Sequence, residues 1–207
     1  MVVEKVDLYG LSPEVIAKYL PAKDCKACGF DSFGAMAVAL SEGTTDLAKC
    51  PELAMRMAES LAGPLSIKLD VHEADASMST VSDKLIEVND PGPESPVIIT
   101  GNSGVTIYVL KLIFSKTPHC SAFIVPTETK GFTVDHAAAL KLMTPMTIMR
   151  ALTNSAVAGR VSTRTLIIPG LAAGIERQVE QMTRWKVVAG PNSGFELPAY
   201  LASIMEG

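Results

Sequence analysis

The first residues that could do chemistry are three cysteines near the start of the chain. Cys25 and Cys28 form a C-x2-C pair, and Cys50 is followed by Pro51. A C-x2-C pair brings two thiolates together on one turn, and a cysteine before proline recurs at iron–sulfur sites. The spacing alone is equally compatible with an iron–sulfur cluster, a zinc site or buried structural thiols. Cys120 lies outside this group and is interpreted as a buried thiol.

A second candidate site is a glycine-bearing loop in the other half of the chain. The apolar segment 97–100 runs into Gly101-Asn-Ser-Gly104, and a helical pattern follows. Such a loop, at the carboxyl end of a parallel strand, is a ligand site because backbone N–H groups point outward there. It could equally be a phosphate loop of the flavodoxin kind. A G-x-G-x-x-G pattern is absent, which disfavours a nicotinamide dinucleotide.

The elements that must position these residues form two groups. The first is helical and carries the cysteines; its expected helices are 12–20, 33–40 and 52–61, the last ended by Gly63-Pro64. In the second, short apolar strands (97–100, 122–125, 166–168 and 186–189) alternate with helices (105–114, 134–143, 146–157, 175–183 and 195–205). This alternation predicts an α/β, doubly wound, Rossmann-like and mostly parallel sheet. The predicted division is a small helical domain at 1–62, a connection at 63–96 and the α/β domain at 97–207.

Composition excludes several classes of partner. The net charge is -4, with no Lys/Arg cluster to bind a polyanion, so nucleic acid is not an expected partner. Hydrophobic residues make up 48%, yet no apolar run reaches membrane-spanning length. Residues 1–9 include Glu4 and Asp7 and do not resemble a secretory signal. Three closely spaced cysteines are more typical of metal ligands in a reducing compartment than of disulfides, so a cytoplasmic protein is expected.

The cysteine segment resembles the [4Fe-4S] module of a known family, the large subunit of the corrinoid iron–sulfur protein, which carries methyl groups in the acetyl-CoA synthase pathway. The matching residues are Leu20, Pro21, Cys25, Cys28, Gly29, Gly43, Cys50 and Pro51. The family's third cysteine falls at Phe33, which cannot bind iron. The resemblance therefore leaves three outcomes: a [4Fe-4S] cluster completed by Asp31, Ser32 or water, a [3Fe-4S] cluster, or an empty module. Cys25, Cys28 and Cys50 are the implied metal ligands.

The same family's corrinoid domain is similar to residues 97–201. The most specific segments are R-T-L-I-I-P-G at 164–170 and E-L-P-A-Y-L at 196–201. The family has a TIM barrel of roughly 250 residues between its two modules, whereas only the connection 63–96 stands there in this chain. Because that barrel helps to pair the large subunit with its small subunit, the resemblance does not extend to that partner.

The resemblance implies a cobalamin-type corrinoid across the carboxyl ends of the strands, with its lower face over the helix that starts near Asn102. Thr106 matches a threonine that lies below the cobalt without ligating it. The expected cofactor-binding residues are Thr100, Gly101, Asn102, Ser103, Thr106, Gly131, Thr133, Pro169, Gly170, Ala173, Gly190 and Pro191. No D-x-H-x-x-G motif is present, and His136 is interpreted as a surface residue. A base-off cobalt with no protein ligand below it is expected.

The leading hypothesis is a corrinoid-dependent methyl carrier in anaerobic one-carbon metabolism, a shuttle more than a self-sufficient enzyme. Its implied partners are methyltransferase proteins that donate and accept the methyl group, and a reductive activator. No catalytic residue is predicted. Two alternatives stay open: a flavodoxin-like FMN electron-transfer protein that uses residues 100–104 as its phosphate loop, and a cofactor-free scaffolding or regulatory subunit.

Overall fold

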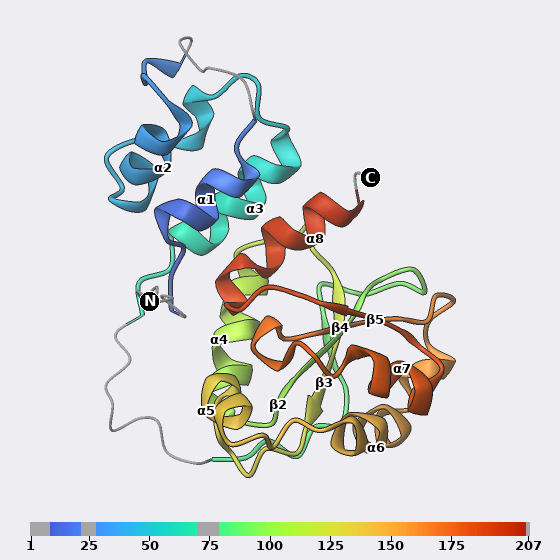
Figure 1. The fold of residues 1–207 in the computed structure, drawn as a ribbon. Helices are drawn as coiled ribbons and strands as arrows, with labels where there is room; N and C mark the ends of the chain where they lie inside the picture. The colour runs from blue at the N-terminus through green and yellow to red at the C-terminus, as the bar shows by residue number, and fades with distance from the viewer. Residues whose placement is uncertain (1–8, 22–27, 70–78, 206–207) are drawn as a thin grey trace. The chain divides into compact units, whose positions relative to one another are not determined.

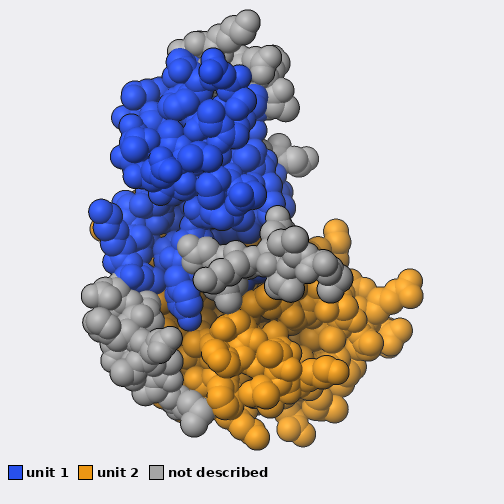
Figure 2. All heavy atoms as spheres, turned by 60° about the vertical axis from the view of Figure 1, so that its left-hand side comes forward, with its two compact units in different colours: residues 1–69, 192–207 blue, residues 70–191 orange. Residues whose placement is uncertain are grey.

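The computed structural model describes residues 9–21, 28–69 and 79–205. The chain divides into two compact units, coloured separately in Figure 2: unit 1 comprises residues 1–69 and 192–207, and unit 2 comprises residues 70–191. This division differs from the predicted domains because the last helix of the chain packs on a helix of the cysteine-bearing part. Residues 192–207 therefore group with unit 1, not with the sheet. In the described residues, no helix has the length and apolarity to cross a membrane.

Unit 1 is helical (Figure 1). Its elements are α1 (Pro13–Tyr19), α2 (Phe33–Ser41), η2 (Leu47–Lys49), α3 (Met55–Leu65), η6 (Gly194–Glu196) and α8 (Leu197–Met205). Ser12 and Ser32 begin α1 and α2 by accepting hydrogen bonds from backbone N–H groups three residues on. Helix α1 packs against α2, and α3 packs against α8, around the fully buried Ile16, Met36 and Leu61.

The predicted end of the third helix was wrong. Helix α3 continues through Gly63 and Pro64 to Leu65, instead of stopping before them. Pro64 lies in the last turn, where the ring removes one backbone donor without breaking a longer run of hydrogen bonds. The N–H of Ser66 still bonds the carbonyl of Ala62. Tertiary packing of α3 therefore overrides the local stop signal.

Unit 2 is built on one five-stranded sheet with the order β1-β3-β2-β4-β5. The strands are β1 (Ile86–Val88), β2 (Val97–Gly101), β3 (Ala122–Thr127), β4 (Thr165–Ile168) and β5 (Lys186–Ala189). Strands β2 to β5 are parallel and confirm the predicted strands and the α/β fold class. Strand β1 pairs antiparallel with β3 at the edge, and its three residues were too few to show a pattern.

Alternating side chains of the strands build the core of unit 2. Val97, Ile99, Phe123, Val125, Leu166 and Ile168 form one cluster with apolar residues of three helices. Those helices are α5 (Val134–Ala139), α6 (Pro145–Ser155) and α7 (Glu176–Thr183), of which α6 and α7 lie side by side in Figure 1. Helix α4 (Gly104–Ser115) packs against β1 and β2. Each buried aliphatic side chain stabilises the fold by about 1.5–3 kcal/mol, which fixes the strand ends that carry the loops.

Candidate functional site

The carboxyl ends of the parallel strands define the candidate site. From β2 the chain passes to β3 on one side, and from β3 it crosses to β4 on the other side of β2. Strand order therefore reverses between β2 and β4, which is where open α/β sheets bind ligands. The loops that leave this edge begin at Asn102 and Pro169. The predicted cofactor residues all belong to this edge, to its neighbouring loops or to the first turn of α4.

Asn102 ties the loop after β2 to the loop after β3. Its side-chain oxygen accepts hydrogen bonds from the N–H of Thr129 (3.0 Å), the hydroxyl of Thr129 (2.9 Å) and the N–H of Gly131 (3.3 Å). Its side-chain nitrogen donates to the carboxylate of Glu128 at 3.2 Å. Because Asn102 and Thr129 are both buried, these bonds are shielded from water. Asn102 therefore acts as a junction that sets the shape of the second loop.

Close packing at Gly101 depends on the missing side chain. A Cβ on Gly101 would lie 3.0 Å from the Thr129 hydroxyl and 3.3 Å from the carbonyl of Phe132. In the same loop, Lys130 and Gly131 adopt left-handed backbone angles, with φ of 58° and 78°. The backbone of this loop therefore turns tightly against the end of β2.

The loops after β4 and β5 form a second pair. The N–H of Gly170 donates to the carbonyl of Pro191 at 2.9 Å, and the N–H of Gly190 donates to the carbonyl of Ile168 at 2.8 Å. The short helix η5 (Gly170–Ala172) packs against α5, which follows the loop that Asn102 shapes. The two pairs of loops are thus connected along one edge of the sheet.

The predicted site residues differ in exposure. Thr100, Gly101, Asn102, Ser103 and Gly131 are buried; Thr106, Thr133, Pro169, Gly170, Gly190 and Pro191 are half-buried; Ala173 is exposed. Thr106 lies in the first turn of α4, and Thr133 is the residue before α5, where its hydroxyl lies 3.0 Å from Nδ1 of His136. His136 is exposed and also lies 3.2 Å from Asp135. Whether these residues contact a cofactor stays a prediction.

Two buried hydroxyls at this edge have no hydrogen-bond partner. They are those of Ser103 and Thr127, which are 1% and 0% exposed and account for two of the four such side-chain atoms in the described residues. Ser103 stands at the N-cap of α4 but does not cap it, and Thr127 ends β3 beside Gly101. An unsatisfied buried hydroxyl costs free energy, so each of these two fits a group that forms a hydrogen bond with a ligand.

Sequence reasoning missed Thr127, Glu128 and Thr129. Thr127 carries one of the unpartnered hydroxyls, and Glu128 and Thr129 bond Asn102. The signal was available, because this polar run directly follows the apolar segment 122–125 and therefore stands at the same sheet edge as residues 101–103.

The cysteine segment contributes two buried thiols to unit 1. Cys28 and Cys50 are both buried in unit 1, while Cys25 lies outside the described residues. Ser32 accepts the capping hydrogen bond from Ala35 (3.1 Å), and Phe33 is the first residue of α2. The Ser32 hydroxyl is therefore engaged in starting a helix, and the neighbouring Asp31 is exposed. Within the described ranges, no group of three or more His, Cys, Asp or Glu side chains is arranged to hold a metal ion.

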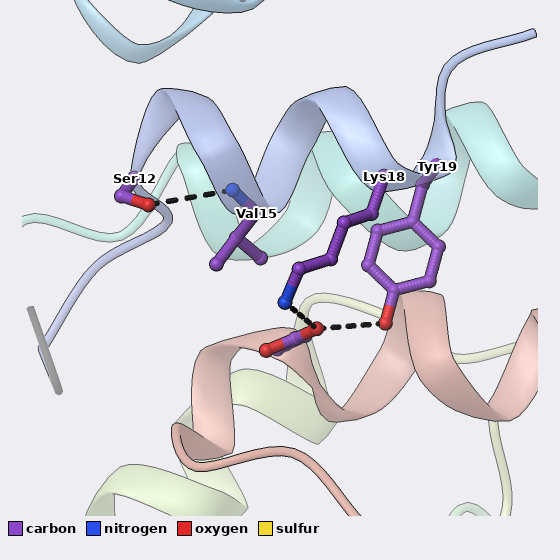
Figure 3. A network of polar contacts seen from close by, with 5 residues as sticks. Ser12, Val15, Lys18 and Tyr19 are labelled. Carbon is purple, nitrogen blue, oxygen red and sulfur yellow. Dashed lines mark hydrogen bonds and ion pairs between the residues drawn. The ribbon is translucent and has the colours of Figure 1, made fainter. Parts of the chain in front are cut away.

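A buried carboxylate connects the two chain segments of unit 1, residues 1–69 and residues 192–207 (Figure 3). Glu196 of η6 accepts a hydrogen bond from the Tyr19 hydroxyl at 2.9 Å, and Lys18 lies 3.5 Å from the same oxygen. Burial and the adjacent Glu196 carboxylate raise the pKa of Tyr19 far above its usual 10.0, so the phenol keeps its proton. The contact fixes the end of α1, one residue before Leu20-Pro21 and the cysteines.

Comparison with known proteins gives two family matches. A model described as the CO dehydrogenase/acetyl-CoA synthase delta subunit matches residues 53–201, more than half of the chain. A model whose description names an Fe-S cluster matches residues 20–52. The first match covers α3, the whole sheet of unit 2 and the start of α8, and the second match covers the cysteine segment.

Curated relatives carry related names. The chain is 26% identical over 137 residues to the acetyl-CoA decarbonylase/synthase complex subunit gamma of Archaeoglobus fulgidus, covering 66% of this chain and 29% of the relative. The subunit gamma of Methanothermobacter thermautotrophicus is 27% identical, with 66% and 30% covered. The corrinoid/iron-sulfur protein large subunit of Moorella thermoacetica is 26% identical over 120 residues, with 58% and 27% covered. The matched part spans less than a third of each of these relatives.

Proposed function

Because the chain belongs to the family of the CO dehydrogenase/acetyl-CoA synthase delta subunit, we propose that it is a methyl carrier that binds a corrinoid on unit 2. The gamma subunits and the corrinoid/iron-sulfur protein among its relatives support a corrinoid iron–sulfur role in general. The observation that carries the proposal is the sheet edge at the strand-order reversal. There the loops after β2 and β3, and likewise those after β4 and β5, are joined by hydrogen bonds, and two buried hydroxyls have no partner.

The residues present fit such a ligand. Ser103 and Thr127 would donate to the amide groups around the ring, and Thr106 would lie beneath it on the first turn of α4. Gly131, Thr133, Pro169, Gly170, Ala173, Gly190 and Pro191 would line the ring with main chain and small side chains. When bound, a base-off corrinoid supplies a cobalt centre that accepts and releases a methyl group. The chain's own contribution is to hold the ring and to keep water from its lower face.

We further propose that unit 1 holds an iron–sulfur cluster on Cys25, Cys28 and Cys50. Burial of Cys28 and Cys50 and the match at residues 20–52 support a cluster in this segment. Iron and sulfide measured in anaerobically prepared protein should fall in Cys50→Ala and stay unchanged in Cys120→Ala, which removes a buried cysteine of unit 2. Equal iron in both variants and the wild type would refute these ligands.

The partners proposed for the chain are proteins. The acetyl-CoA decarbonylase/synthase names describe subunits of a complex, so methyl-donating and methyl-accepting proteins and a reductive activator are the natural candidates. The chain is shorter than these relatives, and its own set of partners is part of the proposal.

A flavin carrier is the second candidate, and the strand order supports it. The parallel strands run in the order β3-β2-β4-β5, which corresponds to the flavodoxin-like order 2-1-3-4. In that case the loop 101–104 would surround an FMN phosphate. Phe132, whose carbonyl accepts a hydrogen bond from Thr129, is an aromatic residue that lies beside Gly101 of that loop.

Visible spectroscopy separates the two candidates. The full chain is mixed under anaerobic conditions with hydroxocobalamin or, separately, with FMN, and then desalted. The corrinoid proposal expects retained corrinoid with a base-off spectrum and no retained flavin. Retention of FMN alone would favour the electron carrier, and retention of neither would favour a cofactor-free subunit.

A further inference from the structure

A short segment of unit 2 lies across the start of α4. Residues 79–81, named the strap here, pair with residues 102–104. The N–H of Val81 donates to the carbonyl of Asn102 at 2.9 Å, the N–H of Gly104 donates to the carbonyl of Ser79 at 2.8 Å, and Thr80 and Ser103 form an antiparallel bridge. This pairing could not be predicted from the sequence, because residues 79–81 fall in the expected connection 63–96.

The strap occupies donors and space that a ligand would use. The first N–H groups of a helix have no partner within the helix, and here the Ser79 carbonyl accepts from the first of them. A Cβ on Gly104 would clash with the side chain of Ser79, so Gly104 makes room for the strap. Ser103, beneath the strap, is 1% exposed and its hydroxyl has no partner. The strap therefore covers the helix start and satisfies its first N–H group, while the Ser103 hydroxyl stays without a partner.

Among the described residues, two backbone hydrogen bonds join the strap to the start of α4. Ser79 and Thr80 are exposed and Val81 is half-buried. The two backbone hydrogen bonds each have a modest net strength in water. A ligand that satisfies Ser103 and the helix start can therefore displace it.

We propose that the strap is an internal competitor for the corrinoid site, so that the strap-closed and corrinoid-bound forms exclude each other. The inference rests on the proposed corrinoid function. Apparent affinity for a ligand falls in proportion to the fraction of protein that is competent to bind it. Weakening the strap should consequently tighten corrinoid binding without touching a residue of the binding edge.

Val81→Pro tests this directly. Proline removes the N–H that bonds Asn102 and tolerates the extended residue before it, while the control Val81→Ala keeps the N–H. Titration of the full chain with cobinamide, followed by visible absorbance, should give a dissociation constant about three- to ten-fold lower for Val81→Pro, the range that one ordinary hydrogen bond confers. Val81→Ala should match the wild type.

A measurement on the wild type guards against a variant that misfolds. Hydrogen exchange at the Val81 amide should be slow without corrinoid and faster with saturating cobinamide, because the strap leaves. If the wild type binds cobinamide and Val81→Pro binds it with equal affinity, the competition by the strap is refuted. It is also refuted if the Val81 amide stays protected in the complex. In both cases the proposed corrinoid function still stands. Binding by none of the three proteins would overturn both.

Discussion

The carboxyl edge of the sheet in unit 2 and the cysteine segment of unit 1 are built in different ways. At the sheet edge, buried hydrogen bonds within the protein hold the loops, with Asn102 bonded to Thr129 and Gly131 and Gly170 bonded to Pro191. In the cysteine segment, the residues around the family's third ligand instead start a helix, with Ser32 as its cap and Phe33 as its first residue. Internal hydrogen bonds therefore hold the sheet edge in shape, whereas the described part of the cysteine segment offers two buried thiols, Cys28 and Cys50, and no group of three metal ligands.

The largest expected effect follows from removing the junction in unit 2. Asn102→Ala leaves the N–H groups of Thr129 and Gly131 buried without their acceptor, so the free energy of unfolding should fall by about 2–4 kcal/mol. Chemical denaturation followed by far-UV circular dichroism measures it. Asn102→Asp keeps the acceptor but sets a carboxylate beside Glu128, which lies 3.2 Å from the present amide nitrogen. Comparable stability of Asn102→Ala and the wild type would contradict the role of Asn102.

The next effect concerns close packing at the same edge. In Gly101→Ala the new Cβ meets the Thr129 hydroxyl at 3.0 Å, and we expect a loss of about 1–3 kcal/mol in stability together with weaker corrinoid binding. Gly92→Ala is the matched control, because Gly92 is exposed and a Cβ there meets nothing within 4 Å. An equal shift of the thermal unfolding midpoint in both variants would contradict the claim that close packing at Gly101 excludes a side chain.

Unit 1 should respond to loss of the Tyr19 hydroxyl. Tyr19→Phe removes the 2.9 Å hydrogen bond that the hydroxyl donates to the buried Glu196. We expect the free energy of unfolding to fall by about 1–2 kcal/mol. Lys18→Ala should cost less than about 0.5 kcal/mol because the lysine is exposed. Chemical denaturation of each variant at neutral pH measures the two losses in the free energy of unfolding. Equal losses would contradict the claim that the hydrogen bond contributes more to stability than the ion pair.

The same hydroxyl predicts a pH dependence. The pKa of Tyr19 is raised in the folded protein, so the unfolded chain loses its proton first as the pH climbs past the ordinary 10.0. The stabilisation is complete below that pH and declines above it. Denaturation series at neutral and alkaline pH should show a smaller alkaline loss in Tyr19→Phe than in the wild type, and identical profiles would contradict the assignment.

The smallest effect on stability, and the sharpest on binding, is expected at Ser103. Its buried hydroxyl has no partner in the protein, so Ser103→Ala should not lower the free energy of unfolding. Affinity for cobinamide should fall about three- to ten-fold, as expected for one lost hydrogen bond. Ser115→Ala, at the far end of the same helix, should change neither quantity. Unchanged affinity in Ser103→Ala would remove Ser103 from the site.

The sequence carried much of the fold because its strands are continuous apolar runs bounded by turn residues. Segments 97–100 and 186–189 became β2 and β5 almost unchanged. It did not reveal β1, which has three residues, or the strap, which is held only by backbone groups. It also could not assign residues 192–207 to unit 1, since the packing of α8 on α3 depends on contacts far apart in the chain.

The site was predicted as a set of loops and not as a set of contacts. Gly101, Asn102 and Gly170 were named from their places after the strands, which the parallel sheet brings to one edge. The bonds of Asn102 to Thr129 and Gly131 could not be read from the sequence, because side-chain hydrogen bonds follow from backbone positions fixed by the whole fold. The unpartnered hydroxyl of Thr127 was invisible for the same reason.

Cobalt content tests the central claim most directly. The full chain, purified under anaerobic conditions, incubated with hydroxocobalamin and desalted, is analysed for cobalt and iron by elemental analysis. The proposed function predicts stoichiometric cobalt in the wild type, whatever the iron content, and a lower amount in Gly101→Ala than in Gly92→Ala. Wild-type protein that retains iron but no cobalt would contradict a corrinoid site at the edge of this sheet.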